Sequence, residues 1–71
     1  MDAATWIAAF AKELGVEAPT DEVIEELLSL AGTAAHASER KAAPIACFLV
    51  AMSGQTAADA HAIARRIPTD S

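Results

Sequence analysis

The segment PIACFLVAM, residues 44–52, carries no charged side chain and constrains the fold of this chain more than any other feature. No polar stripe interrupts it, so a helix formed by these residues is apolar on every side. Such a helix is too short to cross a bilayer, which requires about 20 residues. In a globular protein, a helix that is apolar all round is buried by its neighbours. We therefore expect a helix over residues 44–53, opened by Pro44, to be the central element of a helical domain.

A helix over residues 3–14 is predicted by apolar residues at three- and four-residue steps, which form one stripe on a helix. This stripe consists of Trp6, Ile7, Phe10 and Leu14. Asp2 is a suitable N-cap, and Gly15 can adopt the left-handed conformation that ends a helix.

The next helix is expected over residues 21–37, with Thr20 as its N-cap. Its predicted buried positions are Val23, Ile24, Leu27, Leu28, Ala31 and Ala35. Gly32 is its weak point, because glycine inside a helix costs about 1 kcal/mol relative to alanine. We expect a continuous helix that bends at Gly32 or is packed closely there by another helix. The alternative is that Gly32 ends the helix.

The last helix is expected over residues 57–66. Thr56 and Asp59 resemble a capping box, and Pro68 ends the helix. Its predicted buried stripe contains Ala57, Ala60, Ile63, Ala64 and Ile67. The sequence therefore predicts one all-α domain over residues 1–71, a compact four-helix bundle or orthogonal array with its third helix central, and a loose C-terminal tail over residues 68–71.

Charge and cysteine content limit the classes of partner. The net charge is −5, and residues 1–30 carry seven acids against one base, Lys12. Nucleic acids and anionic membranes require basic surfaces, so we expect neither as a partner. The single cysteine, Cys47, cannot form an internal disulfide, and the first residues lack a basic, continuously apolar leader. Both features are typical of a cytoplasmic protein.

The residues able to bind a metal or perform acid–base chemistry are few. His36, Glu39, Cys47 and His61 match no recognised zinc-ligand spacing, so we predict no metal and no cofactor. His36 and Glu39 could share one face of a continued helix, as an acid–base pair requires. No nucleophile or phosphate-binding loop accompanies them, so we predict that the chain is not an enzyme.

The polar cluster His36, Glu39, Arg40 and Lys41 is the candidate binding site. Cationic side chains near a helix C-terminus commonly bind its last carbonyls, so we favour a structural latch formed by Arg40. The other interpretation is an anion site beside the N-terminus of the third helix.

Trp6 is the candidate interface residue, because tryptophan is enriched in both protein cores and interface hot spots. We favour a core anchor, since a domain with three aromatic residues needs its large side chains inside. Small helical domains also gain stability by oligomerising, which keeps a homodimer among the expectations.

The segments TWIAAFAKELGV and DEVIEELLSLAGTAAHASERKAAPIACFLVAM resemble a small actinobacterial domain family of unknown function. That family is associated with molybdopterin-guanine dinucleotide biosynthesis proteins, in which it occurs as an appendage or as a free-standing chain. The resemblance spans about Trp6 to Met52, and its most specific pattern is AH-x-x-ER-x-x-AP, here His36, Glu39, Arg40, Ala43 and Pro44. The glycine-rich nucleotide loop of a guanylyltransferase is absent from the sequence. The resemblance therefore implies an accessory domain.

These observations predict a cytoplasmic, non-enzymatic helical accessory or protein-interaction module. The resemblance links it to a molybdenum-cofactor nucleotidyltransferase, and its partner is either another protein or a second copy in a homodimer. The alternative function is a small-ligand or anion-binding domain that uses His36, Arg40 and Lys41.

Overall fold

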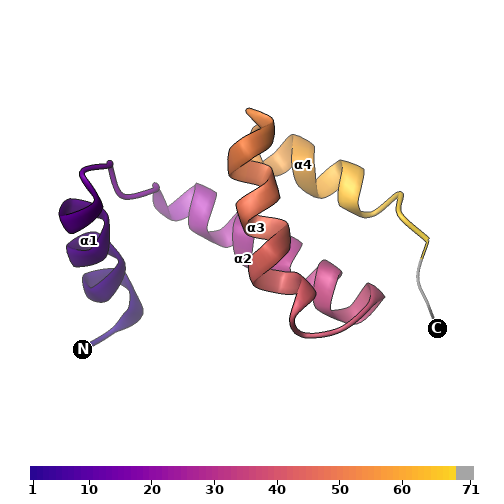
Figure 1. The fold of residues 1–71 in the computed structure, drawn as a ribbon, viewed down its shortest axis with the longest axis horizontal. Coiled ribbons are helices and arrows are strands. Elements are labelled where there is room, and N and C mark those ends of the chain that lie inside the picture. The colour runs from indigo at the N-terminus through magenta and orange to yellow at the C-terminus, as the bar shows by residue number, and fades with distance from the viewer. Residues whose placement is uncertain (69–71) are drawn as a thin grey trace.

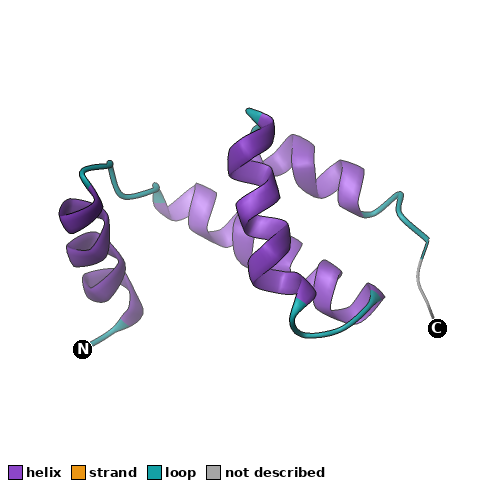
Figure 2. Cartoon of the chain, viewed as in Figure 1, coloured by secondary structure: helices purple, strands orange, loops and turns teal. Residues whose placement is uncertain are grey.

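The computed structural model describes residues 1–68, which form α-helices and no strand (Figures 1 and 2). The helices are α1 (Ala3–Leu14), α2 (Asp21–Ala37), α3 (Ala42–Ser53) and α4 (Ala57–Ala64). The predicted all-α array is thereby confirmed, with the first two helices at their predicted bounds. Helix α3 begins two residues before the predicted position, and α4 ends at Ala64 and continues into a turn. Most of the predicted tail, residues 69–71, lies outside the described residues.

Two threonines cap helices as predicted. Thr20 Oγ1 accepts a hydrogen bond from the Val23 N–H at 3.2 Å at the start of α2. Thr56 Oγ1 accepts one from the Asp59 N–H at 3.1 Å at the start of α4. Each bond satisfies one of the N–H groups that the first turn of a helix leaves without a partner, and this fixes where the helix begins.

Helix α1 is bounded by the two predicted residues. Asp2 Oδ1 accepts a hydrogen bond from the Thr5 N–H at 2.8 Å. Gly15 ends the helix with φ 79°, and Gly54 ends α3 in the same way with φ 75°. Side chains rarely adopt these left-handed conformations, so glycine is required at both stops.

Helix α2 is the element on which α3 and α4 pack (Figure 1). Helix α3 crosses α2 steeply, and α4 lies beside the crossing. Helix α1 lies apart, at the other end of α2, and makes few contacts with the rest of the chain. The connection between α1 and α2 therefore holds α1 away from α3 and leaves space between them.

Leu30 of α2 is the one large side chain in residues 1–68 that is fully buried, with 1% of its surface exposed. The predicted buried stripe omitted Leu30 and included Leu28, which is 63% exposed, so both assignments were wrong. The apolar residues of α2 extend over more than one of its faces. Helical periodicity alone could not indicate which of these faces α3 and α4 would cover.

Helix α3 is covered by α2 on one side only. Its half-buried residues include Ala43, Ala46, Cys47 and Val50, whereas its exposed large residues are Ile45, Phe48, Leu49 and Met52. We predicted that the other helices surround α3. Within one chain they cover it only in part. The physical reason is that α1, which could have covered it, lies at the far end of α2.

Helix α2 continues through Gly32, which excludes the alternative that this glycine ends it. A Cβ added at Gly32 would meet no atom within 4 Å beyond the helix's own backbone, so no other helix of residues 1–68 packs closely there. No helix among the described residues combines the length and hydrophobicity needed to cross a membrane.

Candidate functional site

The predicted polar cluster lies at the connection between α2 and α3. His36 is in the last turn of α2, and Glu39, Arg40 and Lys41 follow in the connection, all exposed. Lys41 Nζ lies 3.6 Å from Glu39 Oε2, an exposed ion pair of the kind that contributes little stability. The Arg40 side chain makes no hydrogen bond or ion pair within residues 1–68. The predicted latch from Arg40 to helix-end carbonyls is therefore not formed.

His36 faces a different neighbourhood from that of Arg40 and Lys41. It lines an open cavity of about 700 Å³ between α2 and the end of α4. The other polar residues of that lining are Ser29, Thr33, His61 and Arg65. The lining of this cavity does not include Arg40 or Lys41, the residues with which the sequence grouped His36.

His61 of α4 is the buried polar residue of the described chain, with 6% of its surface exposed. Its Nδ1 lies 3.0 Å from Glu26 Oε1, and its Nε2 lies 2.8 Å from Thr33 Oγ1. An ionised carboxylate can only accept, so in this hydrogen bond the His61 Nδ1–H donates and Glu26 Oε1 accepts. No buried side-chain nitrogen or oxygen in residues 1–68 lacks a hydrogen-bond partner. We call His61, Glu26 and Thr33 the polar clasp.

The sequence builds the polar clasp from one face of α2 and the middle of α4. Glu26, Leu30 and Thr33 are spaced by four and three residues, so they lie on one face of α2. On α4, His61 is flanked on its own face by the small Ala57 and Ala64. The spacing of residues along the sequence does not predict the clasp, because Glu26 and His61 lie 35 residues apart and meet only through the packing of α4 on α2. The sequence does contain one indication of the clasp: Glu26 and Thr33 lie on either side of Leu30 on the same face of α2.

A hydroxyl, an imidazole and a carboxylate in series also form the relay that activates a nucleophile in some hydrolases. Such a relay needs donors aimed at a developing oxyanion. Thr33 lies within α2, where the backbone N–H groups are used by the helix itself. What the structure shows is that these side chains link α4 to α2 through two hydrogen bonds.

The described part of the chain contains no cluster of metal-binding side chains. No group of three or more His, Cys, Asp or Glu side chains there is placed to hold an ion. Both ring nitrogens of His61 are occupied within the clasp, and Cys47 is half-buried in α3.

Trp6 is 53% exposed, so the core-anchor interpretation is wrong for a single chain. Its ring lies 5.0 Å from that of Phe10, centroid to centroid, at an interplanar angle of 35°. These rings belong to a set of large exposed apolar side chains on three helices, which we call the apolar surface. It comprises Trp6, Phe10 and Leu14 of α1, Leu28 of α2, and Ile45, Phe48, Leu49 and Met52 of α3.

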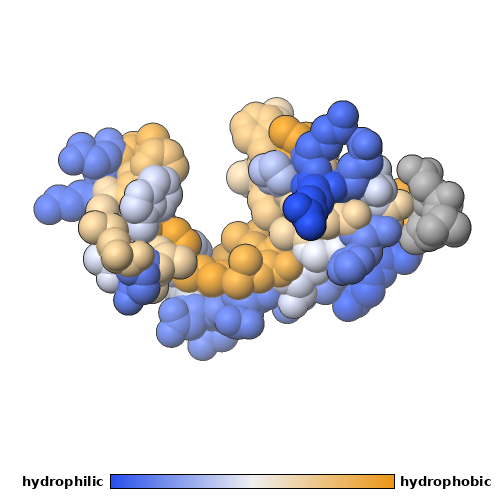
Figure 3. All heavy atoms as spheres, turned by 90° about the horizontal axis from the view of Figure 1, so that it is seen from below, coloured by the Kyte–Doolittle hydropathy of each residue, from blue (hydrophilic) through white to orange (hydrophobic). Residues whose placement is uncertain are grey.

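Figure 3 shows that the molecule is hollowed between two raised arms, with hydrophobic residues along the floor of the hollow. The arms are α1 on one side and the α3 end of the molecule on the other, and α2 joins them. We call this hollow the groove.

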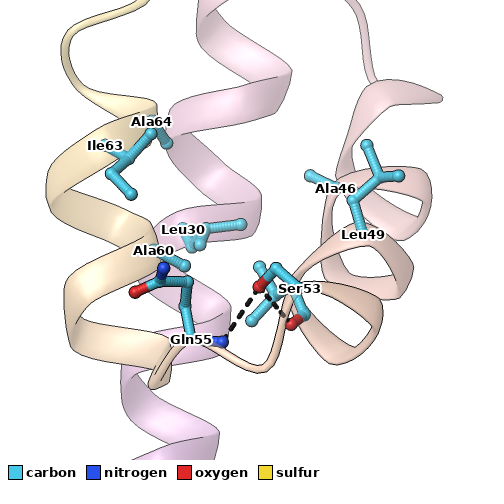
Figure 4. Close-up of a pocket in the computed structure, with 9 residues that line it drawn as sticks. Leu30, Ala46, Leu49, Ser53, Gln55, Ala60, Ile63 and Ala64 are labelled. Atoms are coloured by element: carbon cyan, nitrogen blue, oxygen red, sulfur yellow. Dashed lines mark hydrogen bonds between the residues drawn. The ribbon is translucent and has the colours of Figure 1, made fainter.

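A second apolar recess lies between α3 and α4, with Leu30 at its base (Figure 4). Its volume is about 250 Å³, and its lining includes Ala46, Leu49, Ala60 and Ile63. The Ser53 hydroxyl at its rim donates to the Val50 carbonyl at 2.7 Å and accepts from the Gln55 N–H at 3.1 Å. No charged residue lines this recess, so it offers no charged group to a polar ligand.

Fold and surface together define a small all-α domain, held by one buried leucine and a polar clasp, that presents an uncovered apolar surface. The chain belongs to the family described as a domain of unknown function, DUF6457, whose sequence profile matches residues 1–69. No curated protein and no solved structure matches the chain.

Proposed function

We propose that this chain is a non-enzymatic protein-interaction module that binds another protein molecule through its apolar surface. The observation that carries the proposal is the exposure of large apolar side chains on α1, α2 and α3, together with a hollow whose floor is hydrophobic (Figure 3). Soluble proteins rarely leave extended apolar patches uncovered, and such patches commonly mark binding sites for proteins.

The distribution of charge supports a protein partner over a nucleic acid or an anionic membrane. Helix α3 carries no charged residue from Ala42 to Ser53, and the only charged residues within α1 are Lys12 and Glu13 at its C-terminal end. The net charge of −5 opposes association with phosphates. Apolar side chains without basic neighbours suit the hydrophobic core of a protein interface.

We further propose that the module acts in the cytoplasm as an accessory to a molybdenum-cofactor nucleotidyltransferase. This part of the proposal rests on the resemblance carried by His36, Glu39, Arg40, Ala43 and Pro44. The absence of a nucleotide-binding loop from the sequence supports an accessory role over the transferase itself.

Calorimetric titration with the nucleotidyltransferase of the same host tests this link. We expect saturable binding that Phe48→Glu weakens by at least about tenfold, because the substitution places a charge in the contact. Ile67→Glu is the matched control, since Ile67 is equally exposed but lies beyond α4. Absence of binding contradicts the molybdenum link, and binding that Phe48→Glu leaves unchanged contradicts the use of the apolar surface.

The alternative function, anion binding by His36, Arg40 and Lys41, is favoured by one observation. The Arg40 guanidinium is exposed and unpaired within residues 1–68, and Lys41 stands at the start of α3. Calorimetry with inorganic phosphate and with GTP, on the wild type and on Arg40→Ala, tests this alternative. Heat that the substitution abolishes supports it, and the absence of heat with both compounds removes it.

A further inference from the structure

We propose that the protein molecule bound by the apolar surface is a second copy of this chain, and that α3 of each copy inserts into the groove of the other. In the resulting two-fold dimer, each α3 lies between α1 and α3 of its partner. The inference rests on the proposed interaction function and names the molecule that covers the apolar surface in the isolated protein. A nucleotidyltransferase that binds through Phe48 would compete with the second copy for this surface.

One chain leaves more surface uncovered than a compact monomer of its size. The chain exposes 5555 Å², whereas a compact monomer of 7.3 kDa is expected to expose about 4,150 Å². The radius of gyration is 12.8 Å, against about 11 Å for a compact chain of this length. A dimer that buried this excess of about 1,400 Å² on each chain would bury about 2,800 Å² in total, which lies within the range of obligate homodimers.

Helix α3 is apolar all round, and a helix of this kind is stable in water only when it is surrounded. Within one chain, α2 covers the side that carries Ala43, Cys47 and Val50. The opposite side carries Ile45, Phe48 and Met52, spaced by three and four residues, with Phe48 61% exposed. This second stripe needs an apolar partner that the chain itself does not provide.

The groove supplies such a partner. Figure 3 shows an apolar floor between two raised arms, and Leu28 of α2 together with Trp6 and Phe10 of α1 are exposed apolar residues of these elements. Insertion of an uncharged helix buries no charge between Ala42 and Ser53. The contact therefore avoids the desolvation penalty that disfavours charged interfaces.

The same molecule thus carries an apolar ridge, α3, and an apolar hollow beside it. A two-fold axis places the ridge of each copy in the hollow of the other. Both ridges and both hollows are then covered, and the assembly is closed at two copies. The arrangement also gives α3 the central position that its composition requires, because helices of both copies then surround it.

Sedimentation equilibrium of the wild type tests the inference first. We expect a mass of twice 7.3 kDa at about 100 µM protein, with dissociation on dilution. A mass of 7.3 kDa at that concentration overturns the inference. Such a monomer that still binds the nucleotidyltransferase through Phe48 leaves the proposed function standing, whereas a dimer without that binding overturns only the molybdenum link.

A truncation pair tests the position of the interface. Leu28→Ala shortens a side chain that has little packing within one chain, so each copy is expected to stay folded. We expect it to raise the dimer dissociation constant by at least about tenfold, because in the proposed dimer the exposed Leu28 side chain of α2 contacts the partner's α3. Ile67→Ala is the matched control, with no expected change. Equal dissociation constants for the two variants overturn the groove arrangement.

Trp6 provides an independent optical measurement, because it is the only tryptophan. In the dimer, the partner's α3 covers its ring, so we expect its fluorescence emission to move to longer wavelength on dilution, in step with the loss of mass. Emission that stays constant while the dimer dissociates overturns the placement of α3 beside α1.

Discussion

At the scale of single residues, the polar clasp decides how α4 is held. Helix α4 is short, and both Ile63 within it and Ile67 beyond it are exposed to solvent, contrary to the predicted buried stripe, so little apolar burial fixes its position on α2. His61 contributes both a buried ring and two hydrogen bonds to α2, at 2.8 and 3.0 Å. The stability of the α2–α4 pair therefore depends on one histidine more than on any aliphatic residue of α4.

We expect His61→Ala to lower the free energy of unfolding by about 2–4 kcal/mol, because it opens a cavity and leaves Glu26 and Thr33 without their partner. Urea denaturation followed by circular dichroism measures the change. His36→Ala is the matched control, since His36 is exposed and makes no hydrogen bond in residues 1–68, and its effect should stay within about 0.5 kcal/mol. Equal effects of the two substitutions contradict the clasp.

Asp2 makes the N-terminal cap of α1 dependent on pH. The hydrogen bond from the Thr5 backbone N–H, followed by that from its side chain, lowers the pKa of the Asp2 carboxyl below its ordinary value of 3.8. A group whose pKa is lowered by folding stabilises the folded state above its unfolded pKa, and this contribution is lost as the pH falls through the folded pKa. We expect the Thr5 amide resonance to report loss of the cap below pH 3.8. In Asp2→Ala, this transition should disappear; its persistence would mean that another group titrates there.

At the scale of elements, the bounds of the helices could be predicted from the sequence, whereas their contacts could not. Caps and stops such as Thr20, Thr56 and Gly54 act within a few residues, so sequence spacing carries their information. Leu30 and Leu28 are both leucines on an apolar helix, and only the placement of α3 and α4 decides which one is buried. The clasp escaped prediction for the same reason, because His61 and Glu26 are brought together by packing.

Substitution of Gly32 tests whether the side of α2 that carries this glycine is free of packed neighbours. We expect Gly32→Ala to raise the free energy of unfolding by up to about 1 kcal/mol, since alanine favours the helix and its Cβ meets nothing within 4 Å. Gly54→Ala is the control of opposite sign, because its φ of 75° strains any side chain. Thermal and urea denaturation of both variants measure the change. A loss of stability in Gly32→Ala would contradict the open space beside this residue.

At the scale of the whole molecule, α3 is less buried than its composition predicts. The uncharged segment that forms α3 predicts a surrounded helix, yet one chain surrounds it only in part. The prediction of Trp6 as a core anchor was wrong for the same reason. Each inference treated burial as a property of one chain, whereas a second chain can provide part of it. Sequence patterning indicates that a face is apolar, but not which molecule covers it.

Salt distinguishes an apolar dimer from an association driven by charge. Each copy carries a net charge of −5, so two copies repel one another at long range. We expect the dimer dissociation constant to fall or stay constant between about 50 and 500 mM NaCl, because salt screens this repulsion. Sedimentation equilibrium at both salt concentrations measures it. Marked weakening at high salt would indicate ion pairs across the interface and contradict an apolar contact.

The most direct test of the central claim is a filtered nuclear Overhauser experiment on a mixture of labelled and unlabelled chains, which detects contacts between copies only. The account predicts contacts between the Phe48 ring of one chain and the Leu28 methyl groups of the other. A dimer whose contacts between copies omit Phe48, or a sample without any such contacts, would contradict it.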